Sequence, residues 1–268
     1  MDSFKKIILY GSILICLFFG GCSEKTQREN EWIPSSVASL AKPEENEDLR
    51  SEEVIQEEEN EIPQKCLVIG NSITLGFGTH GMASSDVDTD FYYLVKEHLT
   101  LLNPNLQMKR VDGRPWESCT TTESRKVKLE TILADDLEED TDLVIIQLGD
   151  NVNTAEKIET FSSDCNVMLN YIMGKCPNAR ILWVFGRYNL GNADAIRAAC
   201  QSYGAEYVDI SIVSTDAKYM SYMGAPIIGA DGNTEYIDNG GVASHPGDEG
   251  MRVIADLIIE ALDLYLEE

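Results

Sequence analysis

The feature that most constrains the fold is a repeated alternation of short apolar runs with segments of helical periodicity. Apolar runs typical of buried strands occupy residues 66–69, 106–111, 142–148, 180–185 and 206–210, and helical patterns separate or follow them at 91–99, 125–137, 156–173, 193–203 and from 248 onward. Strands that alternate with helices pair in parallel, with helices on both faces of the sheet. We therefore predict a three-layer α/β/α sandwich around a central, parallel, five-stranded sheet, in one domain spanning residues 64–268.

Two of the helical segments carry further signals. Thr120 and Glu123 have the spacing of a capping box just before the helix at 125–137. In the last helix, apolar residues recur on one face at helical spacing, which predicts that this face is buried: Met251, Ile254, Ala255, Ile258, Leu262 and Tyr265.

The N-terminus has the pattern of an export signal. Lys5 and Lys6 precede a short apolar stretch at residues 7–19, and Phe-Gly-Gly then leads to Cys22. This ending resembles a bacterial lipobox, which implies cleavage after residue 21 and lipid attachment to Cys22. The alternative is an ordinary secretory signal with a chance cysteine. We expect an exported lipoprotein of the cell envelope, at the outer membrane or cell surface, whose lipid anchor is its sole membrane contact.

Residues 22–63 are predicted to be a disordered, acidic linker between the anchor and the domain. Asp and Glu far outnumber Lys and Arg here, and large apolar side chains are few. Such an arm could instead bind a basic partner. The formal net charge of the whole chain is −25, which disfavours nucleic acid and anionic lipid as partners because both would repel it.

The cysteines indicate neither a metal site nor a disulfide framework. Five of the seven fall in the domain, an odd number, and none forms a Cys-x-x-Cys pair. Cys165 and Cys176 would lie roughly 16 Å apart along one helix, too far for a bridge. We expect mostly buried free thiols, and no metal or cofactor.

Three loops that follow or precede these elements contain residues of the types used in nucleophilic catalysis. Ser72 follows the first strand, Asn151 follows the strand at 142–148, and His245 directly precedes the last helix. A serine hydroxyl becomes a nucleophile when a base takes its proton, and histidine does so near neutral pH. An asparagine amide is a common donor to a tetrahedral oxyanion. Ser72 could alternatively serve only as a helix cap.

These loops resemble the sequence blocks of the SGNH (GDSL-type) hydrolases. Gly70-Asn71-Ser72 is similar to the family's Gly-Asp-Ser, Gly149-Asp150-Asn151 to Gly-x-Asn, and His245-Pro246 to its last block, in order across residues 66–266. The resemblance implies a flavodoxin-like SGNH fold and no cofactor.

By that likeness, Ser72 would be the nucleophile and His245 the general base. Asn151 and the backbone N–H of Ser72 would donate to the oxyanion. Gly113 is the position that best matches the family's glycine donor.

Besides Asn71, which stands where the family has Asp, the sequence departs from the family at two further positions. Val242 stands three residues before His245, where the family has the aspartate that orients the imidazole, and Val152 follows Asn151 where Asp is usual. A backbone carbonyl could orient the ring instead, which would leave a Ser-His dyad; Asp238 or Asp248 could also reach it.

For four other reactive or aromatic residues, a structural role competes with a role in the site. His98 falls on an apolar helical stripe and is predicted to border the core, whereas His80 could line a pocket or face solvent. Trp116 could be a stacking platform for a sugar or acyl group, or simply pack in its loop. Cys119 is disfavoured as a nucleophile because no cationic neighbour accompanies it.

The sequence thus predicts an exported, lipid-anchored serine esterase that hydrolyses acyl esters, with O-acetyl groups on carbohydrate as the first candidate substrates. The alternative is a catalytically silent surface lipoprotein of the same fold that binds a glycan or a protein partner. The chain lacks the Gly-x-Ser-x-Gly elbow of α/β-hydrolases and a Gly-x-Gly-x-x-Gly dinucleotide turn, which disfavours both classes.

Overall fold

The computed structural model describes residues 61–76 and 79–266. The predictions of an export signal over residues 1–21, lipidation at Cys22 and a linker over 22–63 fall on residues outside these ranges, apart from the last three of the linker. Within the described ranges, no helix has both the length and the apolar character needed to cross a membrane.

A parallel five-stranded sheet forms the centre of the domain. Its strand order is β2-β1-β3-β4-β5, and every neighbouring pair is parallel. This order belongs to the flavodoxin-like doubly wound folds, in which ligands bind at the carboxyl ends of the strands. The predicted fold class is confirmed. The strands are β1 (Lys65–Gly70), β2 (Gln107–Asp112), β3 (Leu143–Gln147), β4 (Arg180–Phe185) and β5 (Glu206–Asp209).

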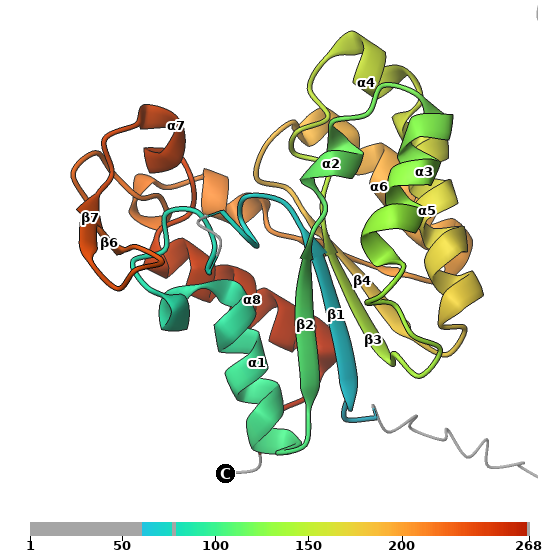
Figure 1. Ribbon diagram of the computed structural model, residues 1–268, viewed down its shortest axis with the longest axis horizontal. Coiled ribbons are helices and arrows are strands. Elements are labelled where there is room, and N and C mark those ends of the chain that lie inside the picture. The colour runs from blue at the N-terminus through green and yellow to red at the C-terminus, as the bar shows by residue number, and fades with distance from the viewer. Residues whose placement is uncertain (1–60, 77–78, 267–268) are drawn as a thin grey trace, which may run out of the picture. The chain divides into compact units, whose positions relative to one another are not determined.

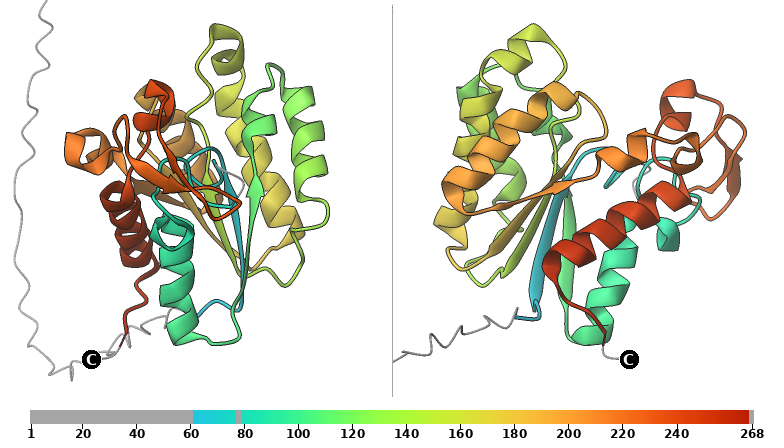
Figure 2. Two further views of the ribbon diagram at one scale, coloured as in Figure 1. Left: turned by 60° about the vertical axis from the view of Figure 1, so that its left-hand side comes forward. Right: turned by 180° about the vertical axis from the view of Figure 1, so that it is seen from behind.

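Helices cover both faces of the sheet (Figures 1 and 2). One face packs against α1 (Phe91–Leu102) and α8 (Asp248–Leu262), and the other against α3 (Thr122–Leu133), α5 (Phe161–Lys175) and α6 (Ala193–Tyr203). Successive strand residues alternate between the two cores: in β1, Val68 faces α1 and α8, whereas Leu67 and Ile69 face α3 and α5. The continuous apolar runs follow from this burial on both faces.

The chain breaks one predicted helix into two. The pattern at 156–173 forms α4 (Ala155–Glu159) and α5, separated at Thr160. The Thr160 hydroxyl donates to Asp164 and accepts from Arg125, whose guanidinium pairs with Asp164 in the core. The requirement to pair these two buried charges places a polar junction where the sequence pattern is continuous.

Two helix boundaries also differ from the predictions. Helix α3 begins one turn earlier than expected, and its capping box joins Thr121 and Ser124 rather than Thr120 and Glu123. In α8 the predicted apolar face is buried as far as Leu262, but the helix ends there and Tyr265 lies beyond it, 61% exposed.

Residues 211–247 form a lobe that the periodicity did not predict. It contains two short 3₁₀ helices, η3 (Ser211–Ser214) and η4 (Ala217–Tyr219), a two-stranded antiparallel sheet and the single-turn helix α7 (Gly240–Ala243). The sheet pairs β6 (Pro226–Ile228) with β7 (Thr234–Tyr236). In Figure 1 this lobe stands beside the upper end of the sheet, on the side of α1 and α8. The remaining short elements are α2 (Arg114–Glu117), η1 (Val87–Thr89) and η2 (Leu190–Asn192).

Candidate active site

Ser72 lies just beyond the carboxyl end of β1, in a loop that is tightly bound to the sheet. The Asn71 N–H donates to the Gln147 carbonyl at 3.2 Å, which continues the pairing with β3 past the end of the strand. Gly70 is required here because a Cβ at this position would lie 1.8 Å from the Thr74 hydroxyl oxygen. The turn therefore places Ser72 at the edge of the sheet with its side chain partly exposed.

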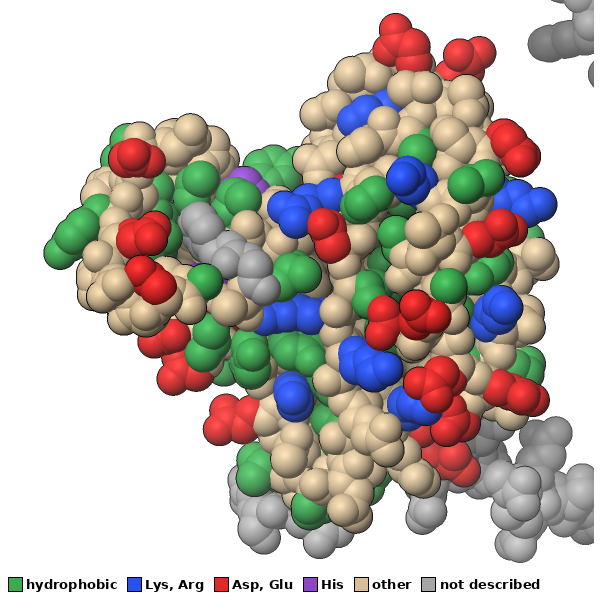
Figure 3. All heavy atoms as spheres, in the orientation of Figure 1, with side chains coloured by type: hydrophobic (Ala, Val, Ile, Leu, Met, Phe, Trp, Pro, Cys, Tyr) green, Lys and Arg blue, Asp and Glu red, His purple; other side chains and the backbone are tan. Residues whose placement is uncertain are grey.

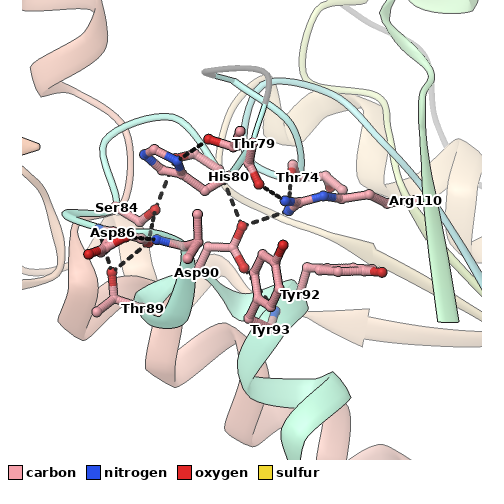
Figure 4. A network of polar contacts seen from close by, with 12 residues as sticks. Thr74, Thr79, His80, Ser84, Asp86, Thr89, Asp90, Tyr92, Tyr93 and Arg110 are labelled. Carbon is pink, nitrogen blue, oxygen red and sulfur yellow. Dashed lines mark hydrogen bonds and ion pairs between the residues drawn. The ribbon is translucent and has the colours of Figure 1, made fainter. Parts of the chain in front are cut away.

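Downstream of Ser72, the loop that leads to α1 is bound by Arg110 of β2 (Figure 4). The guanidinium donates to the Thr74 carbonyl at 2.9 Å, to the Thr79 carbonyl, and to the Asp90 carboxylate at 2.6 Å. Asp90 also accepts from the Gly81 N–H and caps α1. Burial raises the pKa of Asp90 despite the ion pair with Arg110. This network fixes both ends of the loop relative to the sheet.

The Ser72 hydroxyl and the His245 imidazole are in hydrogen-bonding contact. Ser72 Oγ lies 2.8 Å from His245 Nε2, and His245 Nδ1 lies 2.8 Å from the Gly241 carbonyl oxygen. A carbonyl only accepts, so Nδ1 carries the proton and Nε2 is left to accept from the serine hydroxyl. This is the tautomer that a general base toward Ser72 requires.

The ring of His245 is surrounded by groups that keep it neutral. Burial lowers its pKa below the ordinary histidine value of 6.5, and the nearby Arg187 lowers it further, while the bonds to the α7 backbone act in the opposite direction. Tyr188 packs edge-on against the imidazole, with ring centroids 5.7 Å apart. Both Tyr188 and Arg187 donate to the Ser244 carbonyl, so they bind the chain directly before the histidine.

A backbone carbonyl, and no carboxylate of the described residues, orients the His245 ring. The orienting group is the Gly241 carbonyl, and Val242 packs against a small apolar cluster in the lobe. Asp248 accepts from the backbone and the hydroxyl of Ser85, so its carboxylate is occupied away from the imidazole. Asp238 is exposed and forms no hydrogen bond or ion pair with His245 within the described residues. Among the described residues, no carboxylate contacts the ring.

Asn151 follows β3 and is bound by a buried carboxylate that the sequence did not indicate. The amide nitrogen Nδ2 donates to Glu117 Oε2 at 2.6 Å, and the Asn151 N–H donates to Glu117 Oε1 at 3.2 Å. Oε1 also accepts from the Gly149 N–H at 2.7 Å and from Asn71 Nδ2 at 3.3 Å. Glu117, in α2, is fully buried. It joins the loops that follow β1 and β3.

Asp150 is a second buried carboxylate at the same edge. Its Oδ2 accepts from Asn71 Nδ2 at 3.1 Å and Gln147 Nε2 at 2.8 Å, and its Oδ1 accepts from the Tyr188 N–H. Burial, and then the nearby Glu117 carboxylate, raise the pKa of Asp150 to about 6. Asp150 belongs to the Gly149-Asp150-Asn151 motif, so the sequence could have indicated a role for it in the site. Glu117 belongs to no motif, and no sequence feature indicated it.

The two candidate backbone donors differ in what they contact. The Gly113 N–H donates to the Gly70 carbonyl at 2.7 Å, which extends the β1–β2 pairing by one residue. It is therefore occupied in this structure. The Ser72 N–H donates to no other residue of the described ranges. Of the two, Ser72 has the N–H that remains available for an oxyanion.

These side chains line one open cavity of about 320 Å³. Asn151, Ser72 and His245 all face it, so the three loops predicted to carry the chemistry do converge. Polar groups dominate the remaining wall, which suits a ligand with several hydrogen-bonding groups. The lining residues are Ser72, Asp150, Asn151, Asn153, Tyr188, Asn189, Ser244 and His245.

The remaining candidates lie away from this cavity. Trp116 is 1% exposed and packs against Phe161 and the Arg125 guanidinium, so it belongs to the core and is not a stacking platform. His80 is buried and within 2.9 Å of the Thr79 hydroxyl, so it faces neither solvent nor the cavity (Figure 4). His98 borders the core and contacts the Leu264 carbonyl, as predicted.

The five described cysteines are all free, as expected. Four are buried, and the partly buried Cys119 directs its thiol to the Pro115 carbonyl. Within residues 61–76 and 79–266, His, Cys, Asp and Glu side chains form no group of three or more that could hold a metal ion. On the face shown in Figure 3, basic and acidic side chains are interspersed, and the basic ones form no continuous patch.

No protein-family model and no curated protein sequence matches this chain. Solved structures do resemble it. An alpha/beta hydrolase enzyme from the metagenome of Lake Arreo is 15% identical over 75% of this chain and 95% of its own, with a TM-score of 0.49. A variant of Axe2, an acetyl xylan esterase from Geobacillus stearothermophilus, is 16% identical over 76% and 97%, also with a TM-score of 0.49. An extracellular lipase from Streptomyces rimosus is 12% identical over 74% and 99%, with a TM-score of 0.47. At these values the likeness concerns the fold alone.

Proposed function

We propose that this protein is a serine esterase of the SGNH type that hydrolyses short acyl esters. The observation that carries the proposal is the relay from Ser72 through His245 to the Gly241 carbonyl, with both hydrogen bonds at 2.8 Å. The relay supplies a nucleophile, a base in the correct tautomer and a group that fixes the ring. Export and lipid attachment at Cys22 complete the proposal and rest on the sequence alone.

In this mechanism, Ser72 Oγ attacks the ester carbonyl while His245 Nε2 takes its proton. The tetrahedral oxyanion accepts from the Ser72 N–H and from the Asn151 amide. His245 then protonates the leaving alcohol, and an acyl group remains on Ser72. Water attacks this acyl-enzyme with His245 again as the base, which releases the acid and restores the serine. The Gly241 carbonyl dipole stabilises the imidazolium in both steps.

The cavity favours a short acyl group on a polar alcohol such as a carbohydrate. Asn153 and Asn189 offer hydrogen-bonding groups beside the reacting pair, and the described residues around the cavity provide no apolar tunnel for a long chain. A second candidate, a silent binding protein of the same fold, is favoured by one observation: no carboxylate contacts His245 within the described ranges. Loss of the triad acid lowers turnover strongly without abolishing it, so a dyad remains compatible with catalysis.

Hydrolysis of p-nitrophenyl acetate tests the proposal. We expect a clear rate for the wild-type protein and a loss of at least about 10³-fold in kcat for both Ser72→Ala and His245→Ala. Tyr265→Phe, on the exposed chain beyond α8, is the matched control and should retain the wild-type rate. Equal rates in all four proteins would reject the esterase and favour the binding protein. Acetylated oligosaccharides and longer p-nitrophenyl esters then separate carbohydrate from lipid substrates.

A further inference from the structure

We propose that Glu117 is a positioning residue for the oxyanion donor Asn151; the inference rests on the proposed function. Glu117 lies in α2, far from Ser72 and Asn151 in sequence, and makes no contact with the cavity. Its carboxylate nevertheless accepts all four hydrogen bonds described for it from the two loops that carry these residues.

The chemistry of the Asn151 side chain makes its orientation important. Its amide has one acceptor and two N–H donors, and it can turn over at little cost when its surroundings permit. A carboxylate only accepts, so the 2.6 Å bond to Glu117 Oε2 requires Nδ2 to face Glu117. One of the two N–H donors is thereby used, and the second remains for the cavity. The bond thus selects the orientation in which Asn151 is a donor toward substrate.

Burying the Glu117 carboxylate costs free energy, so its hydrogen bonds to the two loops must offset that cost. A fully buried carboxylate is stabilised here by N–H donors alone, since no Lys or Arg of the described ranges forms an ion pair with it. In the proposed mechanism, only the Asn151 amide separates the negative charge of Glu117 from the oxyanion. The carboxylate therefore disfavours the negative charge that develops on the substrate. A neutral glutamine of the same size would avoid that cost but could not fix the Asn151 amide in the same way.

Glu117→Gln tests the hydrogen-bond polarity at constant volume. If Gln Oε1 retains the three donors that bind Glu117 Oε1, its NH₂ group must face Asn151 and turn the amide over. We expect kcat for p-nitrophenyl acetate to fall about 10²-fold with little change in KM, the effect of losing one oxyanion donor. The Glu117→Gln/Asn151→Ala double variant should be no slower than Asn151→Ala alone. Asp112→Asn, in the partly exposed pair with Arg114 on the same segment, is the control and should retain the wild-type kcat.

An exchange of the two groups separates positioning from simple packing. In Glu117→Gln/Asn151→Asp the amide donates and the carboxylate accepts, so the bond reforms with reversed polarity and the fold is supported even if Glu117→Gln alone is unstable. We expect this variant to unfold at a urea concentration near that of the wild type while its kcat stays as low as that of Asn151→Ala. Recovery of kcat, or multiplicative losses in the Glu117→Gln/Asn151→Ala variant, would overturn the proposal.

The Asn151 amide can also be observed without turnover, which separates this inference from the proposed function. In ¹⁵N NMR spectra of the full chain, we expect one Asn151 side-chain proton to be shifted downfield and protected from solvent exchange, and Glu117→Gln to abolish both properties. An unchanged Asn151 signal would overturn the inference whatever the activity. A wild-type rate that Ser72→Ala does not lower would reject the esterase alone.

Discussion

The two halves of the site are built in different ways. Ser72 and Asn151 sit on loops bound to the sheet edge by buried polar groups, among which Asn71 and Glu117 have no exposed surface. His245 instead lies in an exposed turn at the end of the lobe (residues 211–247). The Gly241 carbonyl orients its ring, and the Ser244 carbonyl directly before it accepts from Arg187 and Tyr188. One half depends on particular side chains, and the other depends on the path of the backbone.

The difference indicates where substitutions are tolerated. A buried polar network fails when any member changes its hydrogen-bonding character, because a donor or acceptor is then left without a partner. A backbone carbonyl is present whatever the side chain is, so the histidine half should respond mainly to changes in the lobe's packing. The lobe's own apolar cluster is small: Ala225, Ile227 and Ile237 are buried together with Ala83 from the loop before α1. We therefore expect the histidine half to open more readily.

The largest effect is expected from Asn71→Asp. Asn71 Nδ2 bridges Glu117 Oε1 and Asp150 Oδ2, so aspartate would place a third carboxylate oxygen between two others. We expect the free energy of unfolding in urea to fall by about 3–5 kcal/mol at pH 7. Asn71→Asp/Asp150→Asn should regain most of the loss. A stable, fully active Asn71→Asp single variant would contradict the account of the sheet half.

The next effect concerns pH. The folded-state pKa of Asp150, about 6, lies above the ordinary value of 3.8, so its stabilising contribution is complete below about pH 4 and is lost as pH rises through 6. Asp150→Asn removes this titration. We expect the difference in unfolding free energy, variant minus wild type, to rise by on the order of 2–3 kcal/mol between pH 4 and 7. A difference independent of pH would show that Asp150 does not titrate in this range.

Val242→Asp examines the histidine half. Because Val242 packs against the lobe's apolar cluster and the Gly241 carbonyl already holds Nδ1, an aspartate here would not simply supply the missing triad acid. We expect a loss of about 1–3 kcal/mol in unfolding free energy and no gain in kcat. Val242→Ala is the matched control for lost packing. A higher kcat for Val242→Asp would mean that the α7 turn rearranges to present a carboxylate to the ring.

The smallest effect is expected from Tyr188→Phe. The substitution removes one hydrogen bond to the Ser244 carbonyl, at 2.6 Å, while Arg187 still donates to the same atom and the ring still packs on His245. We expect unfolding free energy to change by about 1 kcal/mol or less and kcat by only a few-fold. A loss comparable to that of His245→Ala would show that Tyr188 acts on substrate rather than on the backbone.

The sequence predicted the sheet well because both of its faces are buried. A continuous apolar run as short as that of β3, bounded by polar residues and a glycine, is typical of a strand covered on both sides. The break at Thr160 was missed because its cause, the Arg125–Asp164 pair, joins residues far apart in the chain. The lobe was missed because short turns and single-turn helices have no period to detect.

The site was predictable only where its chemistry depends on side-chain type. Ser72, Asn151 and His245 occupy loops that a parallel sheet brings to one edge, so their convergence followed from topology. The sequence allowed the expectation that a backbone carbonyl orients His245. It could not show that this carbonyl belongs to Gly241, because every residue has one. Glu117 was not anticipated because its role comes from the fold of α2 over the two loops.

The distance along the chain between the reacting residues has a consequence for biosynthesis. Ser72 and His245 are 173 positions apart, and α8, which packs against α1, immediately follows the histidine. During translation, the serine loop and its buried network can form while the base is still inside the ribosome. Hydrolytic competence would then arrive in a single late step, when α8 docks and covers its face of the sheet. A chain interrupted earlier would lack both the base and that helix, and so the means to cleave esters.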